Sequence, residues 1–169
     1  MAHDEHEHAA ESLGSLRCGV MTVTDSRTEA SDESGALMKE LLTNAGHRVV
    51  RYILLPNEEE LVRSEVSGWL DSGDLDAVLI TGGTGLSSRD RSIEAVRPLL
   101  DKELPGFGEL FRSLSFGEIG PAAMMSRATC GIARGRIVVS LPGSKAAVRL
   151  AFERLLLPQL RHLVQQARK

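Results

Sequence analysis

The chain has 169 residues, of which 42% are hydrophobic, 4% aromatic and 25% charged, and its formal net charge at pH 7 is −3. These values are typical of one globular domain that buries a core without disulfides or metals. The small negative charge argues against nucleic acid or an anionic membrane as the main partner. No apolar run approaches the roughly 20 residues that span a bilayer.

The compartment is predicted from the cysteines and the N-terminus. Cys18 and Cys130 lie outside any CxxC or Cys/His cluster, which favours a reducing cytoplasm. The first residues are acidic and rich in histidine, without the apolar centre of a signal peptide. We interpret residues 1–14 as a disordered tail and residues 15–169 as one domain. The histidines of the tail could chelate a divalent metal, but a solvated tail is the simpler interpretation.

From Leu16 onward, strand-like and helix-like segments alternate along the chain. Short runs rich in Val, Ile, Leu and Thr predict buried strands, and longer runs with apolar residues at helical spacing predict helices. We expect Gly46 to end the first helix, Asn57 to cap the second and Pro158 to interrupt the last. In chain order we expect a strand at 16–24, a helix at 34–45, a strand at 47–55, a helix at 58–71, a strand at 76–80, a helix at 92–100, a turn at 104–106, a helix at 108–115, a strand at 136–141 and a helix at 145–167.

This alternation predicts the α/β class, as a single-domain three-layer α/β/α sandwich with a mostly parallel sheet. Ligands of open α/β sheets bind beyond the carboxyl ends of the strands. Three predicted strand ends carry unusual residues and are therefore candidate parts of one site. They are Thr24-Asp25-Ser26, Thr81-Gly82-Gly83-Thr84-Gly85 and Pro142-Gly143-Ser144-Lys145.

The glycine-rich loop, residues 81–85, is the most informative of the three. Glycines let the backbone approach a ligand and adopt positive φ. Exposed N–H groups and the hydroxyls of Thr81 and Thr84 would form a donor set suited to phosphate. The loop is neither a Walker A motif nor a GxGxxG fingerprint, and a purely structural turn is the alternative.

Asp90 follows this loop, between Arg89 and Arg91 and just before a predicted helix. A carboxylate beside a phosphate loop suits Mg²⁺, which binds through one or two carboxylates and substrate phosphate oxygens. Pairing with a neighbouring arginine, or capping of the helix through Ser92, is an equally good interpretation from spacing alone.

Other segments leave alternatives open. Ser144 could help to hold an anion at a helix N-terminus or act as a simple N-cap. Ser126-Arg127 could face the same crevice or form a surface turn. His47 and His162 are expected to face solvent or neighbouring residues rather than to catalyse. The phenylalanines at 107, 111 and 116 could form an oligomer contact or a local cluster.

Four segments together resemble one known family. The runs ITGGTGLSSRDRSIEA, ELPGFGELFRSLSFGEIG, MSRATCGIARG and LPGSKAA are similar to those of the molybdenum cofactor biosynthesis proteins MogA and MoaB, with SFGEIG and PGS nearer to MoaB. The resemblance covers about residues 16–165. It implies a trimer, or a hexamer of two trimers, that binds molybdopterin, a pterin with a dithiolene and a terminal phosphate. Active members use ATP and Mg²⁺ to adenylylate that phosphate, and hand-over to other proteins of the pathway is implied.

The resemblance also implies roles for particular residues. Asp90 matches the aspartate on which activity depends, and it is the expected metal ligand. Asp25 matches the acidic residue that ends the first strand, near the pterin. Thr81, Gly82, Gly83, Thr84 and Gly85 match the nucleotide and pterin loop, and Ser115, Ser126, Pro142, Gly143 and Ser144 match positions that line the pocket.

One catalytic position departs from the family. Active members have Pro-Asp after the second strand, whereas this chain has Pro56-Asn57. Asparagine keeps the size and a ligating oxygen but brings no charge. Two functions therefore remain: a molybdopterin adenylyltransferase, or a non-catalytic protein that binds and carries molybdopterin.

Overall fold

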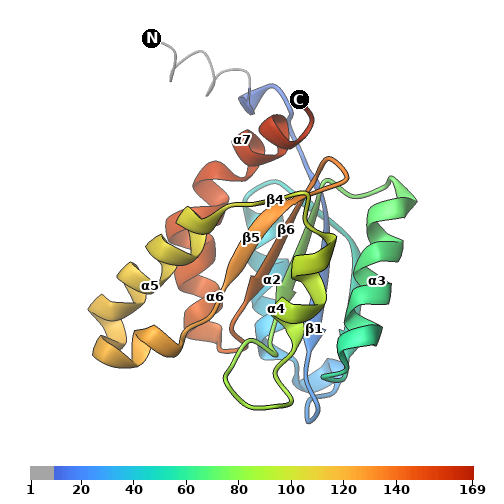
Figure 1. Cartoon of the computed structure of the whole chain (residues 1–169). Coiled ribbons are helices and arrows are strands. Elements are labelled where there is room, and N and C mark those ends of the chain that lie inside the picture. Colours follow the sequence, from blue (N-terminus) through green and yellow to red (C-terminus); the bar gives the residue numbers. More distant parts are fainter. Residues whose placement is uncertain (1–9) are drawn as a thin grey trace.

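The computed structural model describes residues 10–169 (Figure 1). The first nine residues of the predicted tail, with His3, His6 and His8, lie outside the described residues. Residues 10–14 form a turn in which the Leu13 N–H donates to the Ala10 carbonyl at 3.1 Å and Gly14 to Glu11 at 3.2 Å. Arg161 also donates to the Gly14 carbonyl at 2.8 Å, which ties this turn to the C-terminal helix.

The centre of the molecule is a six-stranded sheet of order β2-β1-β3-β6-β5-β4. The first four strands in this order are parallel, and β5 and β4 continue the sheet in antiparallel pairing. The mostly parallel sheet is therefore confirmed, whereas the two antiparallel strands are absent from the prediction. The strands are β1 (Arg17–Val23), β2 (Arg48–Leu55), β3 (Ala77–Thr81), β4 (Lys102–Glu103), β5 (Thr129–Ala133) and β6 (Arg136–Leu141).

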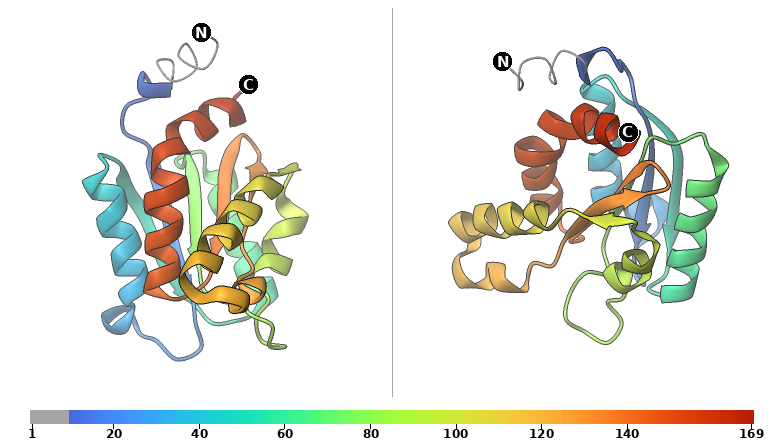
Figure 2. Two further views of the ribbon diagram at one scale, coloured as in Figure 1. Left: turned by 90° about the vertical axis from the view of Figure 1, so that its left-hand side faces the viewer. Right: turned by 45° about the horizontal axis from the view of Figure 1, so that its top comes forward.

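Helices cover both faces of the sheet, which confirms the three layers (Figures 1 and 2). One face packs against α3 and α4, and the other against α2, α5, α6 and α7. The helices are α2 (Glu33–Asn44), α3 (Glu59–Ser72), α4 (Ser92–Val96), α5 (Pro105–Ile119), α6 (Lys145–Ala151) and α7 (Leu157–Ala167). Short 3-10 turns are η1 (Glu29–Ser31), η2 (Arg97–Leu99) and η3 (Gly120–Met125), and η4 (Phe152–Leu156) is a π-helical turn.

The strand β3 lies inside the sheet and is buried along its whole length. Ala77 and Leu79 point into the core under α2, α6 and α7, and Val78 and Ile80 point into the core under α3 and α4. This alternation follows the two-residue period of a strand with both faces covered. On the α3 face, a Cβ at Gly19 would lie 2.6 Å from the Trp69 ring, so glycine allows that ring to pack directly on β1.

Two predicted helix starts are wrong. Asn57 does not cap α3, because Glu58 occupies the N-cap position and no side chain caps this helix. The helix α5 begins at Pro105, where the sequence predicted a turn. Proline at the first helical position loses no hydrogen bond that the helix needs, so the same residue that indicates a turn also starts a helix.

The predicted interruption of the last helix is confirmed, because the π-helical turn η4 ends just before Pro158. Both cysteines are buried and free, and burial raises the pKa of the Cys18 and Cys130 thiols to about 12. Among residues 10–169, no helix combines the length and apolar character needed to cross a bilayer.

Candidate functional site: a cleft at the carboxyl edge of the sheet

A cleft of about 560 Å³ lies at the carboxyl ends of β1, β3 and β6, the lower end of the sheet in Figure 1. The three loops singled out from the sequence meet there, because the carboxyl ends of parallel strands share one edge of a sheet. The cleft is lined by residues 22–27, 82–85 and 142–144, and by Asn57, Asp90, Met125 and Ser126.

The glycine-rich loop has a conformation that requires its glycines. Gly82 and Gly83 have φ values of 95° and 69°, which favour glycine. A Cβ at Gly82 would overlap the carbonyl oxygen of Val23, and one at Gly83 would overlap the Ser92 hydroxyl. The loop is therefore fixed tightly against β1 and the start of α4.

Three consecutive residues of this loop that line the cleft have unused N–H groups. Within residues 10–169, the N–H groups of Gly83, Thr84 and Gly85 have no hydrogen-bond acceptor. The Gly82 N–H does not belong to this set, because it donates to the Leu141 carbonyl at 2.9 Å. Consecutive free N–H groups in a glycine loop form a concave site for an anion such as phosphate.

The two threonines of the loop have different environments. The Thr81 side chain is fully buried, and its hydroxyl donates to the Pro142 carbonyl at 2.9 Å, so it joins two loops from behind and does not line the cleft. Thr84 lines the cleft, although its exposure is only 4%.

The sequence left the orientation of Ser126 and Arg127 open, and the structure gives the two residues different positions. Ser126 lines the cleft. Arg127 donates through Nε to the Thr84 carbonyl at 2.9 Å and through both terminal nitrogens to Glu94, at 2.7 and 3.1 Å. The hydrogen bonds from Arg127 lower the pKa of Glu94, so this pair is ionised at neutral pH. Arg127 and Glu94 thus clamp the loop to α4.

The carboxylate of Asp90 lines the cleft beside the loop. Its Oδ2 accepts hydrogen bonds from the Ser87 N–H at 3.2 Å and the Ser87 hydroxyl at 2.7 Å. It pairs with neither adjacent arginine, since Arg89 binds Asp25 and Arg91 binds Glu59 at 2.8 Å. Asp90 Oδ1 has no hydrogen-bond partner among the described residues, so one oxygen remains available to a ligand.

Asp25 lines the same cleft as Asp90. It accepts the Asn57 N–H at 2.9 Å and the Arg89 guanidinium at 3.0 and 3.1 Å. The hydrogen bond from the Asn57 backbone, followed by the contacts of Arg89, holds the pKa of Asp25 below its usual value. Asp25 is therefore an anion whose charge Arg89 partly neutralises. Within residues 10–169, no three His, Cys, Asp or Glu side chains are arranged as a metal cluster.

The side chain of Asn57 points at the glycine-rich loop. Its Oδ1 is buried without a hydrogen-bond partner in the described chain, and a Cβ at Gly83 would lie 2.5 Å from it. A buried amide oxygen without a donor is rare in folded proteins, and this one is packed against Gly83.

The loop after β6 both caps a helix and closes the cleft. The Ser144 hydroxyl accepts the Ala147 N–H at 3.1 Å, which confirms the N-cap of α6. The Gly143 carbonyl accepts the Ser34 hydroxyl at 2.6 Å and Arg27 at 3.3 Å. Arg27 lines the cleft as a cation that the sequence reasoning missed, although it directly follows the strand-ending Asp25 and Ser26. Lys145 instead faces Glu33, at 3.5 Å.

The structure does not bring every predicted residue to the cleft. Ser115 lies on α5, has an exposure of 5% and is not among the residues that line it. Thr81 supports the cleft from behind. The other predicted residues are brought together as expected; they are Asp25, Asn57, Gly82, Gly83, Thr84, Gly85, Asp90, Ser126, Pro142, Gly143 and Ser144.

Known proteins are similar to this chain in sequence and in fold. The family profile "Probable molybdopterin binding domain" matches residues 19–162. Molybdenum cofactor biosynthesis protein B of Bacillus subtilis is 49% identical over 165 residues, which cover 96% of both chains. A crystal structure of molybdenum cofactor biosynthesis protein B superimposes with a TM-score of 0.88 at 47% identity, covering 90% of this chain and 96% of that one. Tungsten cofactor synthesizing protein MoaB from Pyrococcus furiosus gives 0.83 at 38% identity, covering 92% and 98%. The chain therefore belongs to the MoaB/MogA family of molybdopterin-binding domains.

Proposed function

We propose that this chain acts in molybdenum cofactor biosynthesis, where it binds molybdopterin in the cleft and adenylylates it with ATP and Mg²⁺. The observation that carries this proposal is the row of unused N–H groups at Gly83, Thr84 and Gly85 beside the Asp90 carboxylate. The first feature suits a phosphate and the second a divalent cation that accompanies it. The volume of about 560 Å³ falls within the range of small-molecule sites.

The reaction transfers the AMP group from ATP to the terminal phosphate of molybdopterin. An oxygen of that phosphate attacks the α-phosphorus of ATP, the bond between the α- and β-phosphates breaks, and pyrophosphate leaves. The loop N–H groups and Arg27 hold and orient the phosphates by hydrogen bonds and charge. Asp90, joined by Asp25 when Arg89 turns away, would hold Mg²⁺, which neutralises charge that develops on the phosphates.

The test is an adenylylation assay with purified protein, ATP, Mg²⁺ and molybdopterin. The wild type is expected to form adenylylated molybdopterin and pyrophosphate in equal amounts. Asp90→Asn keeps the size of the side chain but removes the charge, so the rate should fall on the order of 100-fold. The matched control is Asp71→Asn, because Asp71 lies on α3 and pairs with Arg134 away from the cleft. A wild type without product, or an Asp90→Asn variant as fast as the control, rejects the proposal.

A second candidate is a protein that holds and carries molybdopterin without turnover. Asn57 favours it, because the family resemblance expects an aspartate there in active members. The structure adds that the Asn57 backbone binds Asp25, so a carboxylate at residue 57 would add a second negative charge near Asp25. If the chain is such a carrier, it should bind molybdopterin tightly, consume no ATP and remain inactive after Asn57→Asp. Product from the wild type rejects the carrier, and product from the variant alone would show an enzyme impaired by Asn57.

A further inference from the structure

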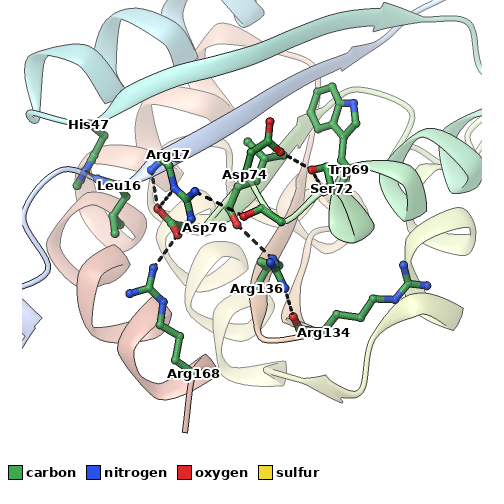
Figure 3. Close-up of polar contacts among 12 residues, drawn as sticks. Leu16, Arg17, His47, Trp69, Ser72, Asp74, Asp76, Arg134, Arg136 and Arg168 are labelled. Atoms are coloured by element: carbon green, nitrogen blue, oxygen red, sulfur yellow. Dashed lines mark hydrogen bonds and ion pairs between the residues drawn. The ribbon is translucent and has the colours of Figure 1, made fainter.

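A second polar cavity lies at the opposite edge of the sheet, where β1, β3 and β6 begin and α7 ends. Its volume is about 250 Å³, and its polar lining consists of Arg17, Asp76, Arg136 and Arg168. Figure 3 shows Asp76 between the guanidinium groups of Arg17 and Arg168, with Arg136 beside them. None of these residues contributes to the cleft at the carboxyl edge.

Asp76 is the one carboxylate of this cavity, and it is already saturated with donors. Its exposure is 5%, and it accepts the Arg17 N–H at 2.7 Å, the Arg17 guanidinium at 3.0 Å and Arg168 at 2.6 Å. Burial opposes its ionisation, but the hydrogen bonds from Arg17 and Arg168 hold the pKa of Asp76 below its usual value. Asp76 therefore compensates one of the three positive charges.

Asp76 is shared between Arg17 and Arg168, and Arg136 has no carboxylate partner among the described residues. Within residues 10–169, Arg136 donates only to the carbonyls of Leu75, at 3.2 Å, and Arg134, at 2.6 Å. Arg168 uses a single guanidinium nitrogen in its contacts within residues 10–169. The neighbouring Asp74 is engaged by Arg51, at 3.0 Å. Positive charge thus accumulates around a cavity in a chain whose net charge is −3.

We propose that this cavity is a binding site for a small multivalent oxyanion of the phosphate class, held by Arg136 and Arg168. Guanidinium groups offer planar pairs of N–H donors that match phosphate oxygens. The volume lies below the range of about 300–1,000 Å³ that is typical for drug-sized ligands, which favours an inorganic anion over a nucleotide or a pterin. The site is independent of the function proposed for the cleft.

A bound anion would join parts of the chain that are distant in sequence. Arg136 is the first residue of β6, and Arg168 directly follows α7. An oxyanion between them would bridge the C-terminal end of α7 to the start of a central strand. Binding to the folded state alone then raises the stability of that state.

The test is an NMR titration of the ¹⁵N-labelled full chain with inorganic phosphate at constant ionic strength. The Gly73 and Gly135 amides report on this cavity, because Gly73 adjoins Arg136 and Gly135 lines the cavity. The Gly83 and Gly85 amides report separately on the cleft. In the wild type, the Gly73 and Gly135 resonances should shift saturably with phosphate.

Two variants decide whether the arginines form a site or only a general positive field. Arg136→Gln should weaken the saturable response of Gly73 and Gly135 at least about tenfold, the loss expected for hydrogen bonds to a charged group. Arg97→Gln removes the same charge outside the cavity, from an arginine that pairs with Glu103, and it should leave the affinity unchanged. The proposal is wrong if these resonances do not saturate, if Arg136→Gln responds like the wild type, or if both variants weaken binding equally.

Discussion

At the scale of single residues, the ion pair between Arg89 and Asp25 decides what the cleft offers to a cation. The two side chains are exposed by 62% and 40%, and they meet at 3.0 Å. Removal of Arg89 takes away a positive neighbour and two donors, so the pKa of Asp25 should rise in Arg89→Ala. It should stay below the usual value, because the hydrogen bond from the Asn57 backbone is the larger cause of its depression.

The measurement is a carboxyl NMR titration of Asp25 in Arg89→Ala and in Arg91→Ala. The control removes an adjacent arginine that binds Glu59 instead. We also expect Mn²⁺ to bind Arg89→Ala more tightly than the wild type, because the carboxylate is no longer occupied. An Asp25 pKa that is the same in both variants would contradict the pairing seen in the structure.

A second prediction concerns His47, the residue directly before β2. Its side chain is buried, with an exposure of 4%. Its Nδ1 accepts the Leu16 N–H at 3.2 Å, and its Nε2 is buried without a partner in the described chain. Burial and then the charge of Arg161 lower the pKa of His47. The folded state therefore holds the neutral ring, and the unfolded state takes up a proton first as the pH falls below about 6.5.

Stability should accordingly decrease between pH 7.5 and pH 5.5, and His47→Gln should remove part of this decrease. Urea unfolding midpoints at the two pH values measure it. Glutamine keeps an acceptor for Leu16 but does not titrate in this range. If the wild type and the variant lose the same stability, His47 is not the titrating group.

Residue roles were predictable from the sequence only where a residue type allows few alternatives. Gly82 and Gly83 were recognised because few other residues adopt their φ values. The local pattern alone left the roles of Asp90 and Asn57 open, because a carboxylate or an amide after a strand can cap, pair or bind, and only the family resemblance assigned them. Only the three-dimensional contacts show that Asp90 avoids both adjacent arginines and that Asn57 faces Gly83.

At the scale of elements, the glycine-rich loop keeps its shape through the clamp formed by Arg127 and Glu94. The two side chains are exposed by 29% and 25%, so water screens the pair only partly. Glu94→Gln removes the charge and should free Arg127 from its fixed position. The Gly82 and Ser92 amides, which donate to the Leu141 and Gly83 carbonyls, should then exchange with solvent about fivefold faster, which corresponds to about 1 kcal/mol.

Hydrogen exchange followed by mass spectrometry or NMR measures this effect. Glu103→Gln is the control, because Glu103 pairs with Arg97 at 2.6 Å and does not contact the loop. Equal loop exchange in both variants would show that the clamp does not hold the loop.

The elements themselves were largely predictable where hydrophobic periodicity is strong. The predicted strands at 16–24, 47–55, 76–80 and 136–141 correspond to β1, β2, β3 and β6. The missing strand β5 has the sequence TCGIA, which is too short and too mixed to show a period. Its pairing with β6 through a tight turn at Arg134 and Gly135 explains its place at an antiparallel edge.

At the scale of the whole molecule, α5 and η3 project from the sheet (Figure 1). They carry several exposed apolar side chains, which we call the apolar face. The exposed side chains include Leu110, Phe116, Ile119 and Met124, with Phe116 at 61% and Met124 at 77%. By contrast, Phe107 and Phe111 are buried and stack at 6.3 Å, so only Phe116 remains for an oligomer contact. Exposed apolar faces of this kind mark interaction surfaces.

We expect the chain to form the trimer or hexamer that the family resemblance implies, with this face in the interface. Phe116→Asp should then shift the mass measured by light scattering toward the monomer. Leu86→Asp is the control, because Leu86 is exposed by 68% in the loop between the glycines and Asp90. A monomeric wild type, or an undiminished mass in Phe116→Asp, would contradict this expectation.

The three-layer architecture was predictable from the alternation of strands and helices. This alternation remains recognisable even when the predicted ends of the elements are wrong by a few residues. The strand order was not predictable, because it depends on which strands pack side by side rather than on local pattern. The position of the cleft was predictable without the strand order, because the loops after parallel strands lie at the same edge of the sheet. In the structure, the loops after β1, β3 and β6 meet there.

Equilibrium binding of molybdopterin to three proteins tests whether this cleft is the molybdopterin site. Ser126→Trp places a large side chain in the cleft, and Ser64→Trp places the same side chain on the exposed face of α3. We predict that the wild type and Ser64→Trp bind with the same affinity, whereas Ser126→Trp binds at least about tenfold more weakly. Equal binding by all three proteins would show that molybdopterin does not bind in this cleft.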